Sequence, residues 1–176
     1  TFWYTKVMKI SKKIFKLETE TAFAVLEKAN KMIFEGRDVV NLGIGQPDFK
    51  TPENIVQAAI KALKDGHHGY TPSNGIIQLR ESVSEYIYKN YKTNVNPDNI
   101  LITPGGKPVI FYSALILGDR ESEIIYPDPG FPIYKSMINY SGAKSIPLVL
   151  NEKNNFEIEI DELEKLITDK TSLIII

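Results

Sequence analysis

Apolar positions in the first half of the chain recur at helical spacing. After Thr21 they predict one helix ending near Gly36. The segments 51–66 and 75–91 predict two more, joined by the loop HHGYTPSNG. The first helix is predicted from Ala22, Val25, Leu26, Ala29 and Ile33.

The pattern changes at Ile100. Short β-rich runs at 100–103, 123–127, 144–150 and 172–176 alternate with helical runs at 107–117, 131–142 and 160–168. Strands that alternate with helices are typical of right-handed βαβ units. The sequence therefore predicts an α/β fold with a mostly parallel sheet flanked by helices.

The amino-acid composition argues against several classes of function. Hydrophobic residues make up 43% of the 176 residues, and the formal net charge of −1 gives no reason to expect nucleic acid or an anionic membrane as partner. The absence of cysteine excludes disulfides and thiol chemistry, and two adjacent histidines do not predict a metal site. No apolar run reaches the ~20 residues of a membrane span. We expect a cytoplasmic protein.

Two glycine motifs fail as nucleotide sites. In LGIGQPDF the third glycine of a dinucleotide fingerprint would fall at Asp48, where no helix is predicted to begin. In PGGKP a phosphate loop would need a glycine at Leu101 and a serine or threonine at Pro108. A general anion site remains, because backbone N–H groups at the start of the 107–117 helix can stabilise an anion by roughly 0.3–2 kcal/mol. A plain strand-to-helix turn is the commoner explanation of such a glycine pair.

Three side chains near these loops have two interpretations each. Phe131, at the exit of the strand 123–127, is either a core aromatic or part of a site. Tyr70 either packs locally or reaches a partner. Lys107 is either a Schiff-base nucleophile or a solvated, phosphate-facing lysine, and the second is the better interpretation.

Five segments in register resemble the class I aminotransferases that use pyridoxal 5′-phosphate (PLP), the aspartate aminotransferase-like group. They span the chain from about Ile10 to Ile176, and their agreement in order makes the resemblance specific. The segments are NLGIGQPDFKTPENI, GYTPSNGIIQLRESV, ILITPGGKPVIF, IIYPDPGFPIY and DELEKLITDKTSLIII.

The resemblance implies a role for six residues and PLP as cofactor. Gly105, Gly106 and Lys107 match the cradle for the PLP phosphate, and Pro108 departs from relatives that often have a free N–H there. Phe131 matches the aromatic that stacks on the pyridine ring. Gly45 matches the glycine that meets the substrate α-carboxylate, and Tyr70 the tyrosine that reaches the neighbouring subunit's PLP phosphate, which implies a homodimer.

The resemblance also implies the type I fold of PLP-dependent transferases, with an incomplete large domain. Residues 1–44 would form an N-terminal helix and short strand belonging to the small domain, and 45–176 the first part of the PLP-binding domain. Residues 1–7 precede Met8, whose segment looks like a natural start, so we interpret them as extraneous.

The implied reaction is transamination between an amino acid and a 2-oxo acid, with donor and acceptor left open. A PLP-dependent lyase or decarboxylase of the same fold is an alternative, and a non-catalytic phosphate-binding α/β module is another. No catalytic residue is assigned within the chain, because the resemblance places the Schiff-base lysine beyond Ile176.

We therefore expect the 176-residue chain alone to lack transaminase activity while supplying the phosphate cradle and the ring-stacking residue. The measurement is turnover of an amino acid with 2-oxoglutarate, compared with free PLP. Turnover above that background would contradict the expectation.

Overall fold

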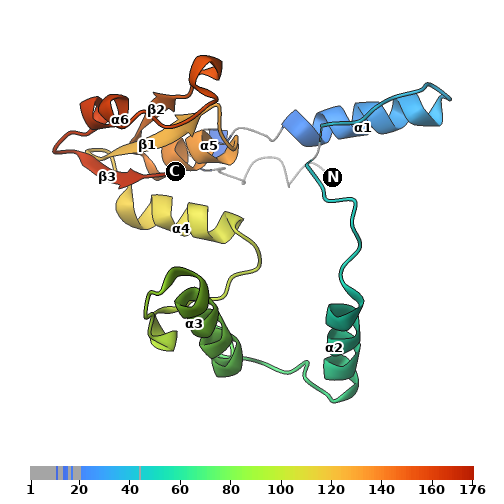
Figure 1. Cartoon of the computed structure of the whole chain (residues 1–176). Coiled ribbons are helices and arrows are strands. Elements are labelled where there is room, and N and C mark those ends of the chain that lie inside the picture. The colour runs from blue at the N-terminus through green and yellow to red at the C-terminus, as the bar shows by residue number, and fades with distance from the viewer. Residues whose placement is uncertain (1–10, 12–13, 16, 18–20, 44) are drawn as a thin grey trace, which may run out of the picture. The chain divides into compact units, whose positions relative to one another are not determined.

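The computed structural model describes residues 11, 14–15, 17, 21–43 and 45–176 (Figure 1). Residues 1–7, interpreted above as extraneous, lie outside this part. The chain forms two compact units, one made of the chain up to Gly43 with Gly106–Ile176, the other of residues 44–105. The boundary at 44/45 derived from the resemblance stays a prediction.

A three-stranded parallel sheet is the centre of the first unit. Its strands are β1 (Glu123–Asp128), β2 (Lys144–Val149) and β3 (Thr171–Ile174), in the order β2-β1-β3 (Figure 1). β1 lies in the middle and is bonded on both edges. The predicted parallel sheet is confirmed.

Helices connect and cover these strands. α4 (Lys107–Leu117) precedes β1, α5 (Ile133–Ser141) joins β1 to β2, and the 3-10 helix η4 (Glu152–Asn154) and α6 (Ile160–Leu166) join β2 to β3. α5 contacts both β1 and β2, and α4 contacts α5 and β3. Because the two crossovers run in opposite directions across the sheet, right-handed connections place α5 and α6 on opposite faces.

The core of this unit forms between β1 and α5. Ile124, Tyr126, Ile138 and Ala143 are buried together, and Tyr134, Leu173 and Ile175 pack against them. Removing one isoleucine side chain from water stabilises the fold by about 1.5–3 kcal/mol. This packing fixes where β1 ends and therefore where the following loop begins.

α1 (Thr21–Phe34) belongs to the same unit and ends close to the predicted stop. Gly36 follows it with φ +83°, a conformation that glycine adopts readily. Ala29 is the buried apolar residue of this helix, while most of its other described side chains are exposed or half-buried.

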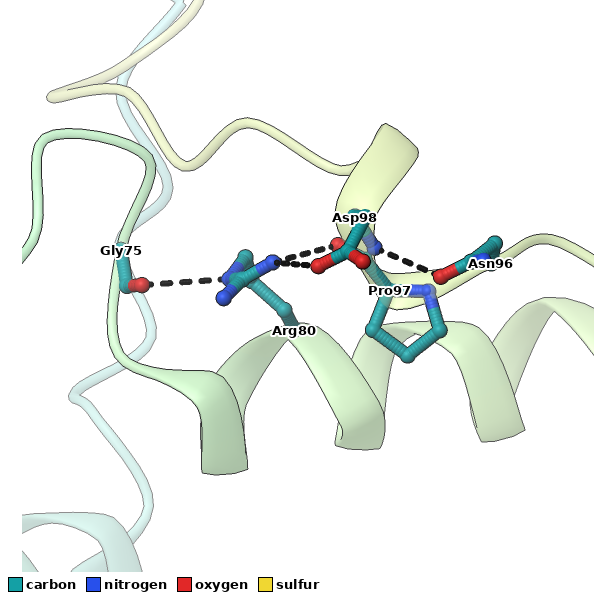
Figure 2. A network of polar contacts seen from close by, with 5 residues as sticks. All are labelled: Gly75, Arg80, Asn96, Pro97 and Asp98. Carbon is teal, nitrogen blue, oxygen red and sulfur yellow. Dashed lines mark hydrogen bonds and ion pairs between the residues drawn. The ribbon is translucent and has the colours of Figure 1, made fainter.

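The second unit contains α2 (Glu53–Lys64), α3 (Ile77–Tyr91) and the 3-10 helix η3 (Pro97–Asn99). Both α-helices agree with the predicted segments. Arg80 of α3 is buried and connects η3 to the loop before α3 (Figure 2).

The strand predicted at 100–103 is wrong. The backbone at Ile100 is extended, with φ −110° and ψ 125°, but the segment joins no sheet. Ile102 instead donates its N–H to the carbonyl of Asn74 at 3.1 Å. A run of β-rich residues predicts extended backbone, whereas its partner depends on distant parts of the chain.

The described part of the chain lacks a membrane-spanning helix and a cluster of metal ligands. None of its helices has the length and apolar character needed to cross a membrane. It also contains no group of three or more metal-ligating side chains close enough to hold an ion.

Glu123 connects the beginnings of the three strands. Its carboxylate accepts a hydrogen bond from Lys144 Nζ at 2.8 Å and from Thr168 Oγ1 at 2.8 Å. The bond from Lys144, followed by that from Thr168, lowers the pKa of Glu123 from its usual value of 4.5. A carboxyl group with a lowered pKa in the folded state stabilises the fold above its unfolded pKa, and this contribution is lost as the pH falls through the folded pKa.

We predict that E123Q is less stable than the wild type at pH 7 and that the difference shrinks as the pH is lowered below 4.5, where the wild-type carboxyl group also becomes protonated. The urea midpoint followed by circular dichroism across this range measures the effect. E164Q, at an exposed position on α6, is the matched control. A pH-independent difference would contradict the prediction.

Candidate functional site

The glycine pair lies at the N-terminus of α4. Gly105 has φ +85°, a left-handed conformation that favours glycine, whereas Gly106 has φ −83° and ψ −21°. α4 begins at Lys107, with Pro108 in its first turn. Pro108 has no N–H, so the backbone donors at this helix end come from the residues before it.

Gly105 takes part in a local turn. Its N–H donates to Thr103 O at 2.9 Å, and Thr103 Oγ1 donates to Gly105 O at 2.7 Å. A ligand that used the Gly105 N–H would have to replace the bond to Thr103. The Gly105 donor predicted from the sequence is therefore engaged within the chain.

Gly106 offers an open donor. Its N–H makes no hydrogen bond within the part of the chain that the structure describes. A Cβ built on either glycine meets no atom within 4 Å, so space is open beside both. A backbone N–H without a partner in the described part of the chain, the positive end of an 11-residue helix and a lysine ammonium suit a phosphate group chemically. The residues present fit the phosphate of PLP.

Lys107 and Phe131 are brought together in the first unit. Lys107 Nζ lies 5.8 Å from the centroid of the Phe131 ring, within the range of a cation–π interaction. Phe131 as a whole residue is 39% exposed. Tyr134 meets it edge-on, with ring centroids 5.8 Å apart and planes at 86°. The ring is thus supported by Tyr134 while part of its surface stays open.

A cavity of about 190 Å³ lies at the carboxyl end of β1, beside Phe131. Gly130 shapes the turn before the ring, because a Cβ on Gly130 would clash with the carbonyl oxygen of Pro127. Ligands of parallel sheets bind at this end of the strands. The cavity is lined by Tyr126, Pro127, Asp128, Gly130, Phe131, Pro132 and Lys135.

Three residues of this region had no predicted role from the sequence. Asp128 and Lys135 place opposite charges on the cavity wall, and Tyr134 supports the Phe131 ring. Two signals could have found them. Asp128 directly follows the predicted strand 123–127, at the edge of the sheet where ligands bind, and Lys135 follows Phe131 by one helical turn.

Gly45, Tyr70 and Gly105 belong to the second unit and are described within it. Tyr70 is fully exposed and lines a cavity of about 670 Å³ together with residues from the end of α2 and the start of α3. Gly45 is exposed, and a Cβ on it would meet no atom within 4 Å. Both positions are accessible to a ligand or a partner.

Comparison with known proteins agrees with this geometry. The family model "Aminotransferase class I and II" matches residues 37–176. Aspartate aminotransferase of Bacillus subtilis (strain 168) is 33% identical over 169 residues, which are 96% of this chain and 43% of that protein. (5-Formylfuran-3-yl)methyl phosphate transaminase of Methanocaldococcus jannaschii is 37% identical over 95% of this chain and 43% of its own length.

Among solved structures, aspartate aminotransferase from Thermus thermophilus with maleate has a TM-score of 0.90 at 28% identity, over 96% of this chain and 44% of that one. The chain belongs to the class I and II aminotransferase family. It spans about 43% of the length of the curated relatives. The family resemblance and the α/β fold are thus confirmed, and PLP is the cofactor of this family.

The open space at Gly106 leads to a prediction about PLP affinity. G106A should change the free energy of unfolding by less than about 1 kcal/mol, because its φ suits alanine and the added methyl meets no atom. It should nevertheless weaken PLP binding if the phosphate lies beside this residue. Urea unfolding and a PLP titration by absorbance measure the two effects.

G105A is the contrasting variant, since φ +85° strains an alanine and lowers stability whether or not a ligand binds. If G106A binds PLP as well as the wild type, the phosphate does not lie at this residue.

Proposed function

We propose that this chain serves a PLP-dependent aminotransferase that exchanges an amino group between an amino acid and a 2-oxo acid. The observation that supports it best is the meeting of Lys107 and Phe131 at 5.8 Å beside the start of α4, in a chain of the aminotransferase family. An ammonium group and an aromatic face are the two features needed to hold a phosphorylated aromatic ring.

The chain's residues would hold and orient the cofactor. Gly106 N–H and the Lys107 ammonium are the proposed phosphate contacts, with Gly105 joining them if its bond to Thr103 opens. Phe131, supported by Tyr134, is the proposed stacking surface for the pyridine ring. When bound, PLP supplies an electron sink that stabilises negative charge at the substrate Cα.

Two further roles concern the substrate and a partner. We propose Gly45 as a backbone contact for the substrate carboxylate, a role supported by the exposure of this residue. We propose that Tyr70 reaches the PLP phosphate of a neighbouring copy in a homodimer, and the complete exposure of its side chain supports this.

We also propose that the protein is located in the cytoplasm.

Product analysis tests the reaction. The full product of the gene, incubated with PLP, a ¹⁵N-labelled amino acid and an unlabelled 2-oxo acid, should transfer the label to the acceptor and yield one keto acid per aminated product. A panel of aspartate, alanine and aromatic donors then identifies the substrate. Elimination or decarboxylation products without label transfer would favour a lyase or decarboxylase, and absence of PLP binding would favour the non-catalytic module.

Phe131 provides the matched variant for this assay. F131A should weaken PLP binding and lower label transfer, because the pyridine ring of PLP loses the side chain on which it stacks. Stacking of an aromatic pair contributes about 0.5–1.5 kcal/mol to the free energy of binding. F34A is the control, because Phe34 is 93% exposed at the end of α1. Equal effects of the two substitutions would count against the stacking role.

A further inference from the structure

Arg80 is a charged side chain buried in the second unit, with 8% of its surface exposed. Its Nε donates to Gly75 O at 3.2 Å, and its Nη1 donates to Pro97 O at 2.8 Å (Figure 2). Nη1 also lies 3.1 Å from Asp98 Oδ1. One guanidinium group therefore connects two backbone carbonyls that are far apart in the sequence.

The two carbonyls belong to the segments that carry the proposed cofactor contacts of this unit. Gly75 ends the loop that contains Tyr70, and Pro97 begins η3, which leads to the segment ending at Gly105. The same segments also touch directly, because Ile102 donates its N–H to Asn74 O at 3.1 Å.

Close packing supports this connection. Gly75 has φ +98°, and a Cβ there would lie 2.5 Å from Ile102 Cγ1. The Tyr70 loop and the segment 100–105 are thus held at a separation that only glycine allows.

The geometry requires arginine rather than a positive charge alone. The planar guanidinium presents several donors in a fixed fork, so it can serve two carbonyls at once, whereas a lysine has a single donor centre. The Asp98 side chain is 81% exposed, so its ion pair with Arg80 is screened by water and adds little. The bonds to the two carbonyls carry the connection.

We propose that Arg80 is a positioning residue for cofactor binding. It holds the Tyr70 loop against the segment that ends at Gly105. It thereby fixes Gly105 for the PLP phosphate that the chain itself binds and Tyr70 for the PLP phosphate of the neighbouring copy. This inference rests on the proposed function, because it assigns those loops to the cofactor phosphate.

The test uses the full product of the gene with R80M and R80K. Both variants should bind PLP about tenfold more weakly, a change of about 1.4 kcal/mol, while the affinity for pyridoxal, which lacks the phosphate, should change much less. The absorbance titrations with PLP and pyridoxal give the two affinities. Loss of affinity for both compounds to the same degree would overturn the positioning role.

Hydrogen exchange of the protein without PLP supplies a readout independent of the cofactor. Amides of residues 69–75 and 100–105 should exchange faster in both variants, while those of β1 and β2 should stay as protected as in the wild type. Unchanged exchange in the two loops would overturn the proposal. If R80M fails to fold, R80K decides the question by the same criteria.

Two further variants separate the effect of charge from the effect of loop position. D98N should leave PLP affinity within about twofold of the wild type, because the Asp98 carboxylate is exposed. G75A should weaken PLP binding like R80K with Arg80 intact, because the added methyl pushes Ile102 away. If D98N weakens PLP binding more than R80K does, charge rather than loop position matters and the proposal is wrong.

The wild type separates the two proposals. If the wild type binds no PLP, the proposed function is overturned. If the wild type and R80K bind PLP with the same affinity, only the role of Arg80 is overturned.

Discussion

The middle strand of a parallel sheet needs hydrogen-bonding partners on both edges and apolar cover on both faces, and β1 imposes this requirement on the first unit. Its residues Ile124 and Ile125 are completely buried. Parallel partners can be reached only through crossovers, so helices must lie between the strands. The position of α5 and the loop from Asp128 to Phe131 follow from this one strand. The candidate cofactor surface is therefore a consequence of how the core is built.

The structure distinguishes Gly105 from Gly106, which the sequence alone could not do. The two glycines differ: Gly105 is committed to a turn with Thr103, while Gly106 presents its N–H at the start of α4 beside open space. Lys107 is set against the Phe131 ring rather than left isolated on the surface. The start of α4 thus offers one backbone donor, the N–H of Gly106, whereas the N–H of Gly105 is bonded to Thr103.

Local signals predicted the elements well. The helix at 107–117 was predicted with the bounds that α4 has, because a Pro-Gly-Gly break and a closing glycine enclose it. The residues 100–103 were predicted as a strand and are not one. Their local sequence favours extended backbone, but it does not determine the hydrogen-bonding partner, and the N–H of Ile102 bonds to Asn74 O instead of to a strand. The approach of Lys107 to Phe131 was likewise implied only by the family resemblance, because it depends on packing between α4 and the β1–α5 loop. Arg80 received no prediction, since a charged residue in an amphipathic helix is ordinarily solvated.

β1 also separates two properties along its length. Its first residue, Glu123, ties the strand beginnings together through Lys144 and Thr168, whereas its last residue, Asp128, lies on the wall of the cavity. The Glu123–Lys144 ion pair and the cavity thus lie at opposite ends of one six-residue strand. A substitution at Glu123 can therefore change the response of the fold to acid without altering the lining of the cavity at the far end of β1.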